Sequence, residues 1–100
     1  MTGEIYTLTE IKNKLEPIFD SYHVRRAVIF GSYGKSVATE RSDVDILVDS
    51  GLRGLNFIGL AESVRAALDK EIDIFDITHI VPDSQIEKEI ERTGVLVYEK

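Results

Sequence analysis

Residues 30–48 read FGSYGKSVATERSDVDILV, and this stretch decides the fold of the chain. Within it, Gly31 and Ser32 are followed by ten residues and then by Asp43 and Asp45, which flank a valine. A glycine directly after a strand lets the backbone turn tightly, and a serine at the start of the next helix offers a hydroxyl and N–H donors to a phosphate oxygen. We therefore predict a strand, a sharp turn into a short helix and a second strand, with Gly31 and Ser32 as a phosphate-binding turn.

The second predicted strand covers residues 43–48 and alternates in character. Asp43 and Asp45 fall on one face, and the apolar residues Val44, Ile46 and Val48 fall on the other. Two aspartates at this spacing have Cα atoms about 6–7 Å apart and can bind divalent cations jointly. Carboxylate oxygens without His or Cys ligands favour Mg²⁺ or Mn²⁺ over Zn²⁺. The pattern predicts a site for two such ions, which can hold a nucleotide triphosphate for in-line displacement.

A third acidic ligand is predicted on the third strand, residues 71–77 (EIDIFDI). Asp73 stands between two isoleucines there, and it completes the site if this strand lies beside the second one. The carboxylate nearest the acceptor is also placed to take the acceptor's proton. Glu71 shares the parity of Asp73 and is the rival ligand, whereas Asp76 has the opposite parity and is disfavoured.

The chain before the first strand predicts a helix. Thr7 and Glu10 fit a capping box, and apolar residues follow at helical spacing until Pro17, which we expect to kink or restart the helix. Residues 24–30 are rich in β-branched and apolar side chains, which predicts the first strand.

The second half of the chain predicts two more helices and a closing strand. Residues 55–68 predict an amphipathic helix whose apolar stripe consists of Ile58, Ala61, Val64, Ala67 and Leu68. A last helix is expected to begin at Pro82, and a short strand follows at residues 95–98. The order of elements predicts an α/β (α+β) domain over residues 1–100, in which helices pack on a mixed sheet of about four strands.

The composition excludes several classes of function. With 12 basic and 18 acidic side chains the net charge is −6, so we expect no nucleic-acid partner held by its phosphate backbone. The chain has no cysteine, which rules out disulfide frameworks, thiolate metal sites and cysteine nucleophiles. No apolar run approaches the roughly 20 residues of a membrane span and the start lacks a signal pattern, so we expect a cytoplasmic protein without a membrane partner.

The quoted stretch 30–48 resembles the signature of the minimal nucleotidyltransferases, the smallest branch of the DNA polymerase β superfamily. The similarity covers most of the chain and implies the DNA polymerase β-like nucleotidyltransferase fold. It implies that Asp43 and Asp45 hold two Mg²⁺ ions and that Asp73 completes the catalytic triad.

The resemblance also implies that the Gly-Ser pair, Gly31 and Ser32, binds the nucleotide phosphates. Many members of the family have Arg-Gly where this chain has Lys35 and Ser36. Lys35 is therefore either a cation for the triphosphate or a solvated helix residue, and both interpretations stay open at this point.

The same resemblance implies a reaction and a partner. Stand-alone domains of this kind look like antitoxins that use ATP to transfer AMP onto a tyrosine of a HEPN ribonuclease toxin. A small-molecule nucleotidyltransferase similar to the aminoglycoside-modifying branch and a non-catalytic antitoxin are the alternatives. We expect a hetero-oligomer in which a second chain completes the acceptor site, and a homodimer stays open.

Overall fold

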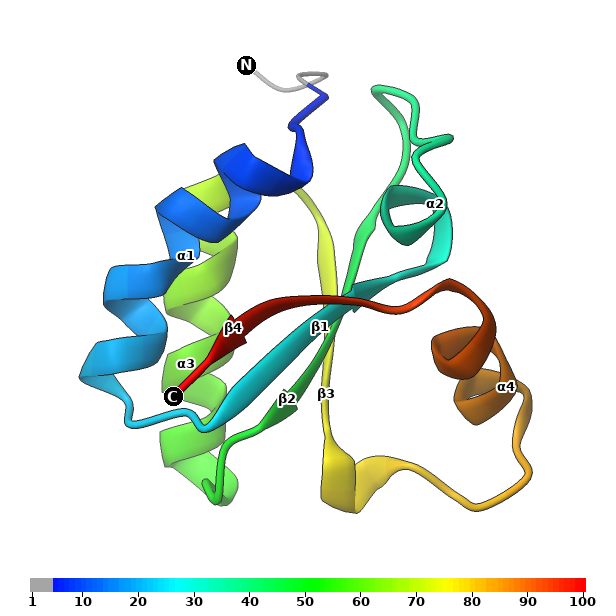
Figure 1. The fold of residues 1–100 in the computed structure, drawn as a ribbon. Coiled ribbons are helices and arrows are strands. Elements are labelled where there is room, and N and C mark those ends of the chain that lie inside the picture. Colours follow the sequence, from blue (N-terminus) through cyan, green and yellow to red (C-terminus); the bar gives the residue numbers. More distant parts are fainter. Residues whose placement is uncertain (1–4) are drawn as a thin grey trace.

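A four-stranded mixed sheet runs through the computed structural model, which describes residues 5–100 (Figure 1). The predicted domain over residues 1–100 thus begins four residues before the described range. In chain order, the elements are α1 Leu8–Ser21, β1 Arg26–Phe30, α2 Gly31–Gly34, β2 Val44–Asp49, α3 Gly54–Leu68, β3 Ile72–Asp76, the 3-10 turn η1 Ile77–His79, α4 Gln85–Thr93 and β4 Val95–Glu99.

The strand order is β3-β2-β1-β4, which confirms the predicted mixed sheet of four strands. β1 pairs antiparallel with both β2 and β4, while β2 and β3 are parallel. Parallel neighbours need a crossover connection, and α3 provides it. This one parallel pairing decides which side chains of β3 stand beside those of β2.

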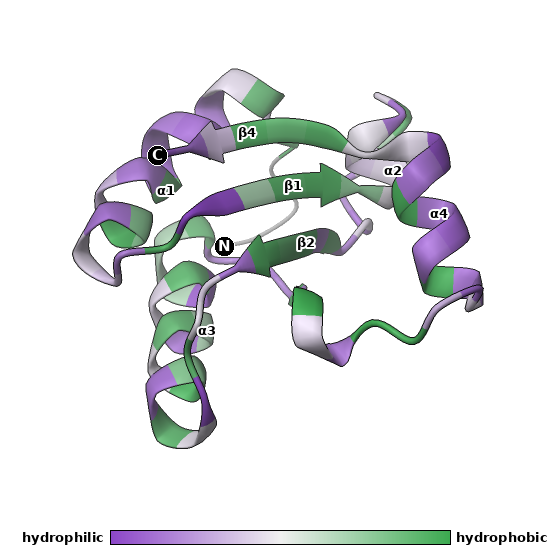
Figure 2. Cartoon of the chain, turned by 60° about the horizontal axis from the view of Figure 1, so that its bottom comes forward, coloured by the Kyte–Doolittle hydropathy of each residue, from purple (hydrophilic) through white to green (hydrophobic). Residues whose placement is uncertain are grey.

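The hydrophobic core lies on the face of the sheet that α1 and α3 cover, where the two helices run side by side (Figure 1). Ala27, Ile29, Ile46 and Val48 point into this core and are fully buried. Helix α4 lies on the other side of the sheet. Figure 2 shows β1 and β4 as largely hydrophobic and α4 as mostly hydrophilic.

The first helix begins as predicted. The Thr7 hydroxyl accepts the Glu10 N–H at 3.0 Å and the Glu10 carboxylate accepts the Thr7 N–H at 2.8 Å, which completes the capping box. Pro17 lies inside a continuous α1, so the helix does not restart there. The Tyr98 hydroxyl of β4 donates to Asp20, and this bond ties the closing strand to α1.

The start of the last helix differs from the prediction. Helix α4 begins at Gln85 and not at Pro82, because Ser84 is the N-cap and its hydroxyl accepts the Glu87 N–H at 3.2 Å. The turn η1, which the sequence did not predict, fills part of the segment between β3 and Pro82.

The buried stripe of α3 agrees with the prediction only in part. Val64 and Leu68 are fully buried as predicted, and Leu60 joins them at a spacing of four residues, whereas Ile58 is 53% exposed. Ile58 stands two positions before Leu60, which places it on the opposite side of a helix with 3.6 residues per turn. None of the helices in residues 5–100 has the length and apolar character needed to cross a bilayer.

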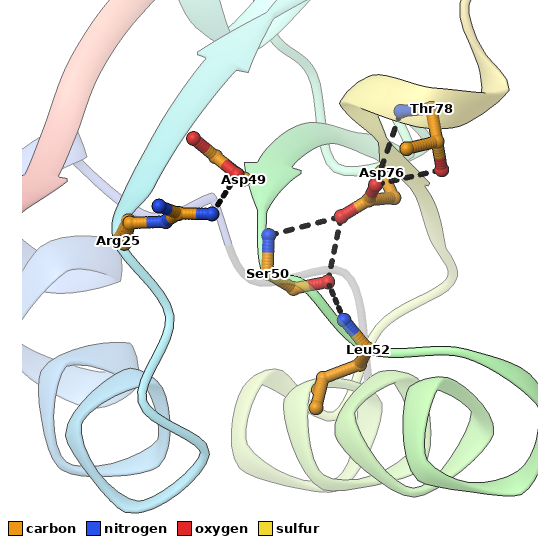
Figure 3. Close-up of polar contacts among 6 residues, drawn as sticks. All are labelled: Arg25, Asp49, Ser50, Leu52, Asp76 and Thr78. Carbon is orange, nitrogen blue, oxygen red and sulfur yellow. Dashed lines mark hydrogen bonds and ion pairs between the residues drawn. The ribbon is translucent and has the colours of Figure 1, made fainter.

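Asp76, at the end of β3, is the centre of a buried hydrogen-bond network (Figure 3). One carboxylate oxygen accepts the backbone N–H of Ser50 at 2.9 Å and the Ser50 hydroxyl at 2.6 Å. The other oxygen accepts the backbone N–H and the hydroxyl of Thr78 at 3.0 and 2.8 Å. Asp76 is only 1% exposed, so this network joins the ends of β2 and β3 inside the protein. Nearby, Arg25 pairs with Asp49 at 3.7 Å across β1 and β2.

Burial raises the pKa of Asp76, but the hydrogen bonds from Ser50 and Thr78 outweigh this effect and hold the pKa below its ordinary value. The stabilisation by the ionised carboxylate is therefore present above the unfolded-state pKa of about 3.9 and is lost as the pH falls further. Asp76 is thus a structural residue, which agrees with its parity on β3.

Replacing Asp76 should destabilise the fold. We expect Asp76→Ala to lower the free energy of unfolding by about 2–4 kcal/mol at pH 7, because it leaves the buried donors of Ser50 and the partly buried donors of Thr78 without their acceptor. Urea denaturation followed by circular dichroism measures this change. Asp73→Ala is the matched control, since Asp73 is exposed on the opposite face of the same strand. Equal losses in the two variants would contradict the structural role of Asp76.

Candidate active site

Asp45 and Asp73 stand side by side on neighbouring parallel strands. The register pairs Asp45 of β2 with Asp73 of β3, on the face of the sheet opposite the main core. Asp45 is half-buried and Asp73 is exposed. The condition for a shared site, that the third strand lies beside the second, is therefore met.

Asp43 and Glu71 lie just outside the two strands, which begin at Val44 and Ile72. Both are exposed, and both line a groove of about 570 Å³ between the α2–β2 loop and the C-terminal end of α3. The charge of Asp43 contributes to the raised pKa of Asp45, which stands two residues further along the chain. Glu71 remains the rival of Asp73 because it shares this groove with Asp43.

Gly31 forms the turn that follows β1 and lies directly against Asp45. Its φ is +74°, in the left-handed region that favours glycine. A Cβ atom at this position would stand 2.2 Å from the Asp45 carboxylate oxygen, so any other residue would force the Asp45 side chain to move. The glycine therefore allows the backbone of the turn to approach the carboxylate.

Thr93, at the end of α4, holds this turn in place, although the sequence analysis did not single it out. The Thr93 hydroxyl accepts the Gly31 N–H at 2.8 Å and donates to the Glu89 carbonyl oxygen at 2.7 Å. Gly34 lies so close that a Cβ would stand 2.2 Å from the Thr93 carbonyl oxygen. Residues 31 and 93 are 62 apart in the chain, so no local pattern could have revealed this bond.

The other predicted phosphate-binding residues lie on or next to the short helix α2. Ser32 is half-buried in it, and its carbonyl oxygen accepts the Val37 N–H at 3.0 Å. Lys35 is exposed at the C-cap. Ser36 has a φ of +63°, so a serine adopts the left-handed conformation that favours glycine.

A pocket of about 260 Å³ opens between the Asp45–Asp73 pair and α4. Phe30 and Phe75 line it from the sheet, with ring centroids 6.3 Å apart, and Glu89 lines it from α4. Glu89 was not among the site residues predicted from the sequence. Its spacing of four residues from Gln85, which also lines the pocket, is the signal that could have placed both residues on one face of the helix.

Asp45 is electrostatically perturbed in the way typical of functional carboxylates. Burial raises its pKa to about 6, and the neighbouring charges of Asp73, Asp43 and Glu89, together with hydrogen bonding to Asp73, contribute to the rise. The fold thus holds acidic groups together at a cost in stability, which a bound cation or proton would relieve.

The donor set fits a hard divalent cation. Asp43, Asp45 and Asp73 offer only carboxylate oxygens, which suit Mg²⁺ or Mn²⁺. Within residues 5–100, no three His, Cys, Asp or Glu side chains already stand in a metal-binding arrangement. The strands therefore bring the carboxylates to neighbouring positions without forming a finished ligand shell.

Comparison with known proteins identifies the family. Residues 13–100 match the family described as Polymerase beta, Nucleotidyltransferase. The chain belongs to this family. It is accordingly a nucleotidyltransferase, whose substrate is a nucleotide, and its sheet is the nucleotidyltransferase sheet that the sequence resemblance implied.

Individual members of the nucleotidyltransferase family are similar over most of the chain. A relative from Methanocaldococcus jannaschii, named "Putative protein adenylyltransferase", is 39% identical over 77 residues, which are 75% of this chain and 83% of the relative. A solved toxin-antitoxin structure with AMP-PNP has a TM-score of 0.71 at 22% identity and covers 89% of this chain and 73% of that one. The structure of a tri-AMPylated HEPN toxin of Shewanella oneidensis in complex with MNT antitoxin has a TM-score of 0.66 at 20% identity, over 93% of this chain and 73% of that one. At these identities the two structures establish the fold.

Removing the charge of Asp45 should stabilise the metal-free protein. The pKa of Asp45 is raised to about 6 in the folded state, so protonated Asp45 contributes to stability at low pH. This contribution is lost as the pH rises towards about 6. In EDTA at pH 7.5 we expect Asp45→Asn to raise the free energy of unfolding by about 1–2 kcal/mol, and this gain should disappear near pH 4. Thermal melts between these pH values measure the effect. Glu91→Gln, on the exposed face of α4, should change little. A destabilised Asp45→Asn variant at pH 7.5 would contradict this account of the site.

Glycine at position 36 should stabilise the loop after α2. Ser36→Gly removes the strain of a left-handed serine, and we expect a gain of about 0.5–1 kcal/mol in unfolding free energy. Chemical denaturation measures it. Ser21→Gly, in the last turn of α1, is the control and should lose stability by a similar amount. A loss of stability in both variants would show that Ser36 is not strained.

Proposed function

We propose that this nucleotidyltransferase transfers AMP from ATP, with Mg²⁺, to a tyrosine hydroxyl of a partner HEPN ribonuclease toxin and so acts as its antitoxin. The observation that carries the proposal is the in-register pairing of Asp45 with Asp73, with Gly31 pressed against Asp45. The name of the archaeal relative, and the AMP-PNP and AMPylated toxin complexes of the structural neighbours, support the choice of reaction and partner.

Each candidate residue has a stated task in this proposal. Gly31 and Ser32 form the phosphate-binding turn: Ser32 binds phosphate oxygens through its backbone N–H group and its hydroxyl, and Gly31, whose N–H is bonded to Thr93, lets the backbone approach the phosphate. Lys35, exposed beside them, neutralises charge on the triphosphate. The close approach that Gly31 permits brings these donors next to the carboxylates, where the phosphorus atom that reacts has to lie.

The acidic residues perform the transfer. Asp43 and Asp45 would hold the two Mg²⁺ ions, with Asp73 sharing one, and bound Mg²⁺ supplies charge neutralisation as the pyrophosphate leaves. The Asp73 carboxylate takes the proton of the attacking hydroxyl. The acceptor oxygen forms a bond to the α-phosphorus while the bond between that phosphorus and the pyrophosphate oxygen breaks, and the electron pair leaves with pyrophosphate.

The charge of the chain suits a protein partner. A net charge of −6 disfavours direct binding of RNA and favours contact with the basic surface that a ribonuclease uses for its substrate. A non-catalytic antitoxin would need the same surface but not the Asp45–Asp73 pairing, since acidic side chains on a half-buried sheet face cost stability. The small-molecule alternative would need no basic partner.

The test is AMP transfer to the partner toxin that co-purifies with the chain. With ATP and Mg²⁺, intact mass spectrometry should show the toxin gaining the mass of one or more AMP groups. Asp43→Asn should lower this transfer by at least about 100-fold, because Asp43 ligates the metal ions, while its circular dichroism melt stays close to that of the wild type.

Glu40→Gln is the matched control, because Glu40 is an exposed acid in the same loop and its carbonyl oxygen, not its carboxylate, accepts the Lys70 side chain at 3.2 Å. It should transfer AMP at the wild-type rate. Two outcomes would overturn the proposal: Asp43→Asn that still modifies the toxin, or Asp43→Asn that neutralises the ribonuclease as well as the wild type without modifying it.

A further inference from the structure

The pocket between the sheet and α4 contains two of the candidate carboxylates in its lining. Its sheet side carries Phe30, Asp45, Asp73 and Phe75, and its helix side carries Ile86 with the polar residues of α4. Three strands and one helix thus contribute to it. Asp45 and Asp73 stand at the same end of the strands as Phe30, as the register of β1 with β2 shows.

The size of this pocket fits one side chain. Its volume of about 260 Å³ is below the range of roughly 300–1,000 Å³ that is usual for sites of drug-sized ligands. Phe30 and Phe75 stand 6.3 Å apart and tilted by 40°, which leaves an aromatic surface for a further ring to contact edge-on or offset. The half-buried Ile86 closes the opposite wall.

One charge around the pocket disfavours phosphate on its helix side. Glu89 lines the pocket and is held there by an ion pair with Arg92 at 2.5 Å. Unlike Asp45 and Asp73, Glu89 is not among the proposed metal ligands, so its carboxylate repels phosphate oxygens from the α4 side of the pocket. A neutral ring that carries a hydroxyl can enter the pocket and still reach a carboxylate.

The direction of the reaction points to the same occupant. In an in-line displacement the attacking oxygen comes from the side opposite the leaving pyrophosphate. The proposed phosphate-binding turn follows β1, and Asp73 lies on β3 at the far side of β2. The acceptor therefore approaches over β3, where Asp73 and Phe75 both line the pocket.

We propose that this pocket, lined by Phe30, Phe75 and Ile86, receives the aromatic ring of the acceptor tyrosine and so selects a phenol over an aliphatic hydroxyl. The inference rests on the proposed AMP transfer and assigns the acceptor specificity to this chain itself. The phenol oxygen bonds to the α-phosphorus of ATP, pyrophosphate leaves with the electron pair of the broken bond, and the phenol proton passes to the Asp73 carboxylate. A second chain then supplies the tyrosine but need not build the pocket for it.

Binding of a tyrosine probe to the full chain tests this assignment without turnover. We expect N-acetyl-tyrosinamide to shift the NMR signals of the Ile86 methyl groups and of Phe75, and N-acetyl-serinamide to leave them unchanged. Ile86→Trp fills the pocket and should weaken binding of the tyrosine probe by at least about tenfold. Gln85→Trp, at an exposed position on the same wall, is a second blocking variant in case Ile86→Trp folds poorly.

Glu91→Trp is the matched control, because Glu91 is an exposed residue of α4 that does not line the pocket. It should bind the tyrosine probe as the wild type does. Equal shifts with the serine probe, displacement of the tyrosine probe by AMP-PNP, or blocking variants that bind as well as Glu91→Trp would overturn the assignment. The two proposals fail separately: a chain that transfers no AMP but binds the tyrosine probe refutes the transfer alone, and a chain that transfers AMP equally well after Ile86→Trp and Gln85→Trp refutes the pocket alone.

Discussion

The parallel pairing of β2 with β3 is the constraint on which the rest of the structure depends. It sets Asp45 beside Asp73, and it requires a crossover, which α3 provides. The crossover helix then packs with α1 against the apolar face of the sheet. The same pairing thus places the core on one face of the sheet and the carboxylates on the other. A change in this pairing would displace both.

The two aspartates of β3 have different roles because their parity places them on opposite faces of the sheet. Asp76 points to the core side and is saturated by donors from Ser50 and Thr78, so it stabilises the fold as an anion. Asp73 points to the other side and meets Asp45, whose pKa is raised by burial and by its acidic neighbours. The pair of Asp45 and Asp73 destabilises the fold, and the Asp76 network offsets part of this loss. Such a distribution is expected where function requires charges to be held together.

The sequence predicted most of the framework because its strongest signals are local. Strand geometry within a few residues predicts the turn at Gly31 and the alternation that places Asp45 on the face opposite the core. It also predicts the parity that separates Asp73 from Asp76. The exposure of Ile58, the start of α4 after Ser84 and the bond from Gly31 to Thr93 depend on how distant elements pack. Glu89 and Phe75 were missed for the same reason, since only the docked position of α4 brings them to one pocket.

The central claim is that the strand pairing assembles one cation-dependent nucleotidyl site from Asp43, Asp45 and Asp73. Anomalous diffraction from crystals grown with Mn²⁺ and AMP-PNP tests it most directly, because manganese is located independently of the protein atoms. The account predicts two manganese peaks bound by Asp43 and Asp45, one of them shared with Asp73, and phosphate oxygens at the Gly31–Ser32 turn. Peaks ligated by Glu71 in place of Asp73, or a nucleotide bound away from these carboxylates, would contradict it.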